Sequence, residues 1–162
     1  MQDFQRLIGL LAENEVRFVI IGGFAASLYG SSCVTEDIDL CIPFDAENMQ
    51  SLLNAFRDIH PAHRLIGKSR PLDEGADQLS RFKNLYLQTD LGSIDLLSEV
   101  AGVGRFNDVM EHSVEIELYG MPCCVLDIES LIRTKREMAR PKDQEAIRQL
   151  EAIKEISNRT EH

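Results

Sequence analysis

Two aspartates interrupt an otherwise apolar strand, and they constrain the fold more than any other feature of this sequence. Asp37 and Asp39 alternate with Ile38 and Leu40. Side chains of a strand alternate between its two faces, so both carboxylates share one face and both apolar side chains share the other. Burying a carboxylate is costly unless it is paired or holds a metal ion. The sequence therefore predicts a strand with its apolar face in the core and its acidic face on a cleft that holds positive charge.

The same alternation recurs in Ser93-Ile94-Asp95-Leu96, which places a third carboxylate on one face of another predicted strand. Three carboxylates in one cleft repel one another and raise their own pKa values unless cations lie among them. Oxygen-only ligands of this kind suit Mg²⁺ or Mn²⁺ rather than zinc. The residues alone leave a second interpretation open, in which these aspartates are solvated or cap turns.

Gly22-Gly23 lies where a predicted strand leads into a short helix. Glycine lets backbone N–H groups come close to a phosphate because no side chain stands in the way. A simple tight turn is the alternative interpretation of this pair.

Lys135 falls in the inward phase of a predicted helix whose apolar face includes Ile128, Leu131 and Met138. A lysine at such a position either extends past the edge of the core into solvent or points into the cleft toward phosphate. The residues alone leave both interpretations open.

Hydrophobic periodicity predicts alternating helices and strands, followed by two hairpins and two helices. The predicted helices cover residues 3–15, 24–29, 45–58, 127–139 and 142–157, and the predicted strands cover residues 17–21, 37–42, 82–89, 93–97, 113–118 and 123–126. Residues 60–80 show little periodicity and are predicted to form a mobile loop or lid. This order is typical of an α/β (α+β) fold with a mixed β-sheet flanked by helices. We expect residues 1–162 to form a single domain, with residues 127–158 as a C-terminal helical pair packed on it.

Composition narrows the classes of partner and the compartment. The chain carries a formal net charge of −10, so an extended nucleic-acid surface, which needs a basic face, is not expected. The apolar runs are too short to span a bilayer, and the first residues lack the layout of a secretory signal. We therefore expect a cytoplasmic protein with its four cysteines reduced. His60 and His63 flank Pro61, and we expect surface histidines there rather than zinc ligands.

The order of the motifs resembles that of a known superfamily. Gly22-Gly23, a short helix, Thr35-Glu36-Asp37-Ile38-Asp39-Leu40 and then Ile94-Asp95-Leu96-Leu97 resemble the motifs of nucleotidyltransferases with the DNA polymerase β-like fold. Within that superfamily the chain is similar to small stand-alone bacterial and archaeal members, the group that includes toxin–antitoxin and antibiotic-modifying nucleotidyltransferases. The resemblance extends over most of the chain.

The resemblance implies a metal-dependent transfer reaction. Asp37, Asp39 and Asp95 would be the catalytic residues, and they would hold two Mg²⁺ (or Mn²⁺) ions that grip the triphosphate of an NTP. The NMP would pass to a hydroxyl acceptor with release of pyrophosphate, and Asp95 would help to remove the proton of the acceptor.

The resemblance also implies nucleotide-binding residues beyond the carboxylates. Gly22, Gly23 and Ser31 would contact the phosphates, and the resemblance favours the phosphate contact for Lys135. The acceptor would be a small molecule, an RNA end or a protein, and a homodimer or a partner protein would be compatible with so short a chain. The alternative is a non-catalytic nucleotide-binding or antitoxin-like interaction module of the same fold, which would usually have lost one of the three carboxylates.

Overall fold

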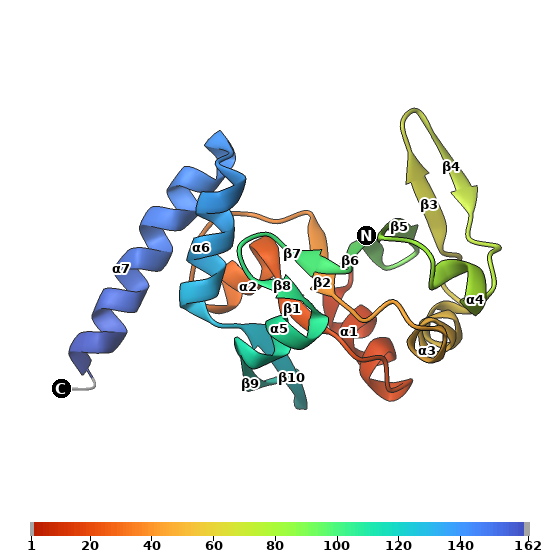
Figure 1. Cartoon of the computed structure of the whole chain (residues 1–162), viewed down its shortest axis with the longest axis horizontal. Coiled ribbons are helices and arrows are strands. Elements are labelled where there is room, and N and C mark those ends of the chain that lie inside the picture. The colour runs from red at the N-terminus through yellow and green to blue at the C-terminus, as the bar shows by residue number, and fades with distance from the viewer. Residues whose placement is uncertain (1, 161–162) are drawn as a thin grey trace.

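The computed structural model describes residues 2–160, and a single large sheet runs through them (Figure 1). Its order is β4-β3-β5-β6-β2-β1-β10-β9. The strands are β1 (Val19–Ile21), β2 (Asp37–Cys41), β3 (Ala62–Leu65), β4 (Lys68–Pro71), β5 (Asn84–Thr89), β6 (Gly92–Leu97), β9 (Ser113–Leu118) and β10 (Met121–Leu126). β1 pairs with β10 and β2 pairs with β6 in parallel, whereas the other pairs of this sheet are antiparallel. The predicted mixed sheet is confirmed.

Helices flank the sheet along its length. They are α1 (Phe4–Glu13), α2 (Gly22–Leu28), α3 (Ala46–Phe56), α4 (Ala76–Leu79), α5 (Phe106–Glu111), α6 (Ile128–Met138) and α7 (Gln144–Thr160), with a 3₁₀ turn at Pro141–Asp143. Figure 1 shows α6 and α7 at one end of the long axis and the β3–β4 hairpin at the other. Among the described residues, no helix is both long and apolar enough to cross a membrane.

The first helix shows how local sequence sets an element. Asp3 precedes α1 and its carboxylate accepts a hydrogen bond from the Arg6 backbone N–H at 2.9 Å, which satisfies one free donor of the first turn. Leu7, Ile8 and Leu11 are fully buried, as their helical spacing predicts. The cap and the apolar face therefore both position α1 on the core.

The central strands follow the predicted alternation. Ile38 and Leu40 of β2 and Ile94 and Leu96 of β6 are fully buried on one side of the sheet. Burial of each such side chain contributes about 1.5–3 kcal/mol. Because side chains alternate along a strand, this burial fixes the aspartates between them on the other side.

The prediction of a mobile loop over residues 60–80 was wrong, because these residues form the β3–β4 hairpin and α4. Gly67 makes the turn of the hairpin with φ of +75°, a backbone angle that glycine adopts without strain. The expected surface position of His63 was also wrong. His63 is buried, its ring stacks on Phe82 at 5.9 Å between centroids, and its Nε2 lies 2.9 Å from Glu74 Oε2.

Residues 98–112 carried no prediction and form a small addition beside the main sheet. β7 (Glu99–Val100) and β8 (Gly104–Arg105) pair as a separate two-stranded sheet, and α5 follows directly. Val109 of α5 is buried, so this addition packs on the core.

Strand β9 forms one edge of the main sheet. It pairs only with β10, over the register Ser113↔Leu126 to Leu118↔Met121. Glu115 and Glu117 alternate with Ile116 along it, and both glutamates are exposed. The edge therefore carries acidic side chains.

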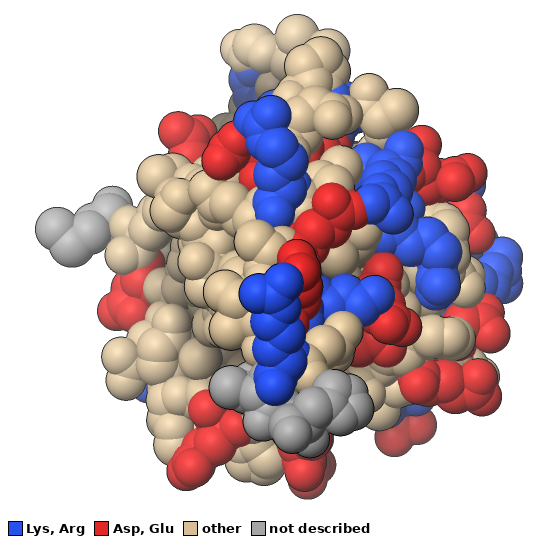
Figure 2. All heavy atoms as spheres, turned by 90° about the vertical axis from the view of Figure 1, so that its left-hand side faces the viewer, with Lys and Arg blue, Asp and Glu red and all other residues tan. Residues whose placement is uncertain are grey.

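The end of the molecule formed by α6 and α7 has charges of both signs. Figure 2 shows Lys and Arg interspersed with Asp and Glu on this face. Several of them pair, including Lys154 with Glu129 at 2.9 Å and Arg136 with Glu151. Exposed pairs of this kind contribute little to stability.

Candidate active site

The register of β2 and β6 brings the three predicted carboxylates together. The strands are parallel neighbours, and Asp39 lies directly beside Asp95. Asp37 lies two residues before Asp39, so it shares the same face. Alternation predicted the face of each strand, and the parallel pairing of β2 with β6 brings the two acidic faces together.

The glycines after β1 let the backbone pass close to the acidic face. α2 begins at Gly22, two residues earlier than the sequence predicted. Gly22 has φ of +68°, and a Cβ at this position would lie 2.2 Å from Asp39 Oδ2. A Cβ on Gly23 would lie 3.2 Å from the side chain of Thr35. Glycine at position 22 is therefore what leaves room for the Asp39 carboxylate.

The environment of Asp39 disfavours its negative charge. Burial is the main cause, and repulsion from Asp37 adds to it; together they raise the pKa of Asp39 from 3.8 to about 6. The positive charges of Lys135, Arg140 and Lys142 act in the opposite direction and are smaller effects. Asp39 is therefore a carboxylate whose ionised form would be stabilised by an added cation.

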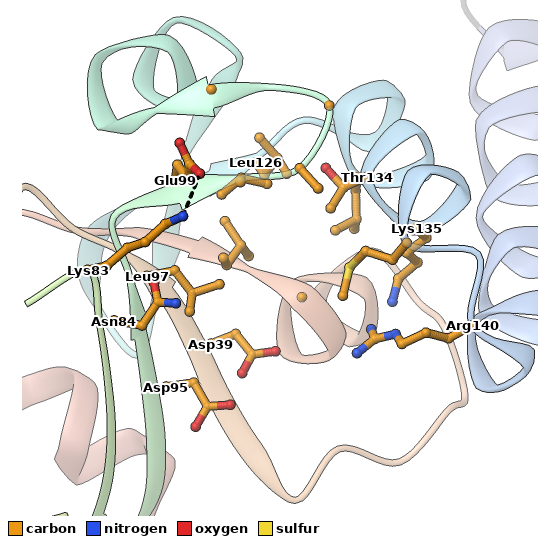
Figure 3. Close-up of a pocket in the computed structure, with 18 of the residues that line it drawn as sticks. Asp39, Lys83, Asn84, Asp95, Leu97, Glu99, Leu126, Thr134, Lys135 and Arg140 are labelled. Atoms are coloured by element: carbon orange, nitrogen blue, oxygen red, sulfur yellow. Dashed lines mark ion pairs between the residues drawn. The ribbon is translucent and has the colours of Figure 1, made fainter.

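Two cavities of about 630 Å³ and 360 Å³ open onto these carboxylates, and Asp39, Asp95, Lys135 and Arg140 line both. Figure 3 shows Lys135 and Arg140 on the opposite side of the larger cavity from Asp39 and Asp95. Leu126, together with other apolar side chains, forms a further wall of that cavity. The larger cavity thus combines an acidic floor, a basic wall and an apolar wall.

Lys135 projects from α6 and is buried, with its Nζ 3.4 Å from Asp143 Oδ1. Arg140 donates two hydrogen bonds to the same carboxylate, at 2.7 Å and 3.1 Å. Burial alone would raise the pKa of Asp143, but the hydrogen bonds from Arg140 and the charge of Lys135 outweigh burial and lower it. Lys135 lines the cavity, as its inward phase suggested, and Asp143 is a partner that the sequence analysis did not foresee.

Ser31 is buried at the contact between the segment after α2 and helix α7. Its hydroxyl donates to Gln149 Oε1 at 2.9 Å and accepts from the Cys33 backbone N–H at 3.3 Å. The structure therefore groups Asp37, Asp39, Asp95, Gly22, Gly23 and Lys135 around the cavities, and it places Ser31 outside their lining. A phosphate contact of Ser31 stays a prediction.

Arg64 of β3, like Arg140, is a residue of this site that the sequence did not single out. Its Nη1 lies 3.3 Å from Asp37 Oδ1, and its Nη2 forms an ion pair with Asp95 Oδ1. The hairpin turn at Gly67 was a local signal for β3 and β4. The pairing of β3 with β5, which aims Arg64 at the aspartates, depends on distant residues and leaves no local pattern.

The chemistry of the carboxylates suits a hard divalent cation, since all the donors are oxygens. Within residues 2–160, no group of three or more His, Cys, Asp and Glu side chains is already arranged to hold a metal ion. A cation of the chain itself, the Arg64 guanidinium, instead contacts two of the three aspartates. Asp37, Asp39 and Asp95 therefore suit a cation between them. A metal ion bound to Asp37 and Asp95 would have to replace the Arg64 guanidinium.

Comparison with solved structures defines the fold. TM1012 of Thermotoga maritima, which carries a nucleotidyltransferase assignment, is 17% identical over 90% of this chain and 88% of its own, with a TM-score of 0.54. An antigenic nucleotidyltransferase-like protein of Paracoccidioides brasiliensis is 15% identical over 94% of this chain and 77% of its own, with a TM-score of 0.58. The antibiotic-resistance factor ANT(2'')-Ia, in complex with adenylyl-2''-tobramycin, is 14% identical over 98% of this chain and 97% of its own, with a TM-score of 0.54. At these identities the likeness establishes the fold alone, which is that of the nucleotidyltransferases.

The family follows from the sequence as a whole. Residues 1–161 match the model of the family described as "Nucleotidyl transferase of unknown function (DUF2204)", and the chain belongs to this family. No curated protein matches the chain. The resemblance to the nucleotidyltransferase superfamily is thereby confirmed.

Proposed function

We propose that this protein transfers the NMP group of an NTP to a hydroxyl acceptor and releases pyrophosphate, in a reaction that depends on Mg²⁺ or Mn²⁺. The observation that carries the proposal is the parallel register of Asp39 and Asp95, with Asp37 on the same face. The family and the fold support nucleotidyl transfer in general.

In the proposed reaction the acceptor oxygen forms a bond to the α-phosphorus of the NTP. The bond from that phosphorus to the bridging oxygen breaks, and pyrophosphate leaves. Asp95 accepts the proton of the acceptor, since it lines the cavity beside Asp39. Lys135 and Arg140 line the same cavity and balance the charge of the triphosphate. Asp37, Asp39 and Asp95 would hold the divalent ions, which supply charge stabilisation at the reacting phosphate.

One structural neighbour supports a proposal for the class of acceptor. ANT(2'')-Ia was solved in complex with adenylyl-2''-tobramycin, a small molecule that carries an adenylyl group. We therefore propose a small molecule with a hydroxyl group as the acceptor. RNA ends and proteins are the acceptor classes to test after it.

The proposal is tested by incubating the protein with each α-labelled NTP, Mg²⁺ and cell extract or an aminoglycoside panel. We expect a labelled acceptor and pyrophosphate with one NTP. Asp39→Asn should reduce transfer at least a hundredfold, because a carboxylate that holds the cation is lost. Asp58→Asn is the matched control, since Asp58 is exposed and outside both cavities. Absence of labelled product with every NTP, together with NTP binding, would support the non-catalytic module instead.

A further inference from the structure

The β3–β4 hairpin brings a cation into the acidic site from the opposite end of the sheet to α6. Arg64 contacts Asp37 and Asp95 through two different nitrogens of its guanidinium. Its side chain is 29% exposed and that of Asp95 is 22% exposed, so this contact is partly shielded from water. A partly buried contact between opposite charges is screened less than one on the surface.

The hairpin is fixed at its base and free at its tip. β3 pairs with β5 through Ala62 and His63 only, so Arg64 lies just beyond the paired part. The buried His63 contacts Glu74 and Phe82 and holds the base in place. All four residues of β4 are exposed, and Ile66 at the turn is fully exposed. Arg70 of β4 pairs with Glu74 at the base, opposite His63, whereas Arg64 connects the next part of the hairpin to the aspartates.

Arg64 is not fully satisfied in this position. Its Nε is buried without a hydrogen-bond partner, and an unpaired buried donor is costly. A divalent cation held by Asp37 and Asp95, as proposed above, would need carboxylate oxygens on the same two side chains that the guanidinium contacts. A guanidinium and a divalent ion at these oxygens exclude each other, because both charges would occupy one small space.

We propose that Arg64 is an internal counter-cation that competes with the divalent ion for Asp37 and Asp95, and that binding of the ion releases the outer half of the β3–β4 hairpin. The proposal rests on the proposed function only in taking a divalent ion as the competitor. Arg64 is thus a residue that sets the affinity of the site for the ion, and the hairpin reports whether the ion is bound.

The first test measures Mn²⁺ binding by calorimetry in the absence of nucleotide. Arg64→Gln should bind Mn²⁺ about tenfold more tightly than the wild type or better, since one charge-assisted contact no longer has to break. Lys68→Gln is the matched control, because it removes one positive charge from the exposed strand of the same hairpin. It should stay within about threefold of the wild type, since exposed charges at a distance are screened. Equal affinities of Arg64→Gln and Lys68→Gln, or no Mn²⁺ binding by any variant, would overturn the proposal.

The second test follows backbone amide exchange of residues 62–71 by mass spectrometry, with and without saturating Mg²⁺. In the wild type and in Lys68→Gln, Mg²⁺ should accelerate exchange in this segment, because the contact that holds its outer half is lost. Arg64→Gln should exchange rapidly under both conditions. Unchanged exchange in the wild type with Mg²⁺ bound would contradict the release of the hairpin.

A further variant and a comparison with transfer activity distinguish failure of this proposal from failure of the proposed function. Arg64→Lys retains the charge but not the forked guanidinium, so its Mn²⁺ affinity should fall between the wild type and Arg64→Gln. Tighter Mn²⁺ binding by Arg64→Gln in a protein that transfers no nucleotide would support the competition and defeat the proposed function. Equal Mn²⁺ affinities in an active enzyme would defeat the competition alone.

Discussion

Asp143 and Asp39 line the same smaller cavity but lie in two regions of the molecule. The two carboxylates differ in whether positively charged side chains of the protein pair with them. Asp143 lies between α6 and α7, is buried, and contacts both Lys135 and Arg140. Asp39 lies on the sheet, forms no ion pair with another described residue, and has its pKa raised to about 6. The pKa of Asp143 is lowered instead. The difference separates a carboxylate that stabilises the fold from one whose charge is left for a ligand.

The largest expected effect tests this difference through stability. Asp143→Ala should lower the free energy of unfolding by about 3–5 kcal/mol, because it leaves the charge of Lys135 buried without its partner. Asp39→Ala should leave the free energy of unfolding unchanged or raise it, since it removes a buried carboxylate that Asp37 repels. Urea denaturation of both variants measures the two effects. A similar loss in both would remove the distinction.

The next largest effect is a dependence of the free energy of unfolding on pH, caused by the raised pKa of Asp39. Its pKa is raised from 3.8 to about 6 in the folded protein, so the folded state binds more protons than the unfolded state between these values. The contribution of Asp39 to the free energy of unfolding therefore falls as pH rises from about 4 to about 6, by up to about 3 kcal/mol. Asp39→Asn lacks this contribution, so in chelator-treated samples its stability relative to the wild type should increase across that window. A difference that does not vary with pH would contradict the raised pKa.

Lys135 connects the two regions, and its replacement should have a smaller effect on stability. Lys135→Met keeps most of the apolar stem, and Asp143 keeps Arg140, so we expect a loss of about 1–2 kcal/mol. The affinity for NTP should fall about ten- to a hundredfold, and more than the affinity for NMP, if the ammonium meets the distal phosphates. Calorimetry with Mg²⁺ present measures both affinities. Lys154→Met on α7 is the control, since Lys154 pairs with Glu129 outside both cavities.

The smallest expected effect concerns Ser31. Ser31→Ala removes the hydrogen bond to Gln149 and should lower the free energy of unfolding by about 1 kcal/mol. Gln149→Ala should give a similar loss, and the double variant should lose less than the sum of the two. Calorimetry with NTP tests the predicted phosphate contact, which requires weaker NTP binding by Ser31→Ala but not by Gln149→Ala.

The elements that the sequence predicted well are those whose patterns are local. In β2 and β6, burial of Ile38 and Ile94 decides which face the aspartates take, so that face followed from alternation alone. The pairing that brings Asp39 beside Asp95 needed the three-dimensional structure. Gly22 could be singled out because a strand ends abruptly there, although its close approach to Asp39 needed the three-dimensional structure. The fold class followed from the order of the elements.

The features that were missed depend on distant contacts. The hairpin over residues 62–71 has mixed charge and weak periodicity, and His63 is buried only because Phe82 and Glu74 come to it from elsewhere in the chain. Arg64 therefore gave no signal of its own. The partner of Lys135 was missed for a similar reason, since Asp143 follows the break at Pro141 and faces α6 only after the chain turns.

The acidic edge of the sheet bears on how copies of this chain meet. An edge strand with unpaired backbone groups can accept a strand from another molecule, which is a common route to aggregation. At β9, addition of a second β9 would bring the exposed Glu115 and Glu117 of one copy beside those of the other. Like charges on neighbouring strands are destabilising. The two glutamates thus act against edge-to-edge growth, and an assembly of this protein would be expected to form through another face.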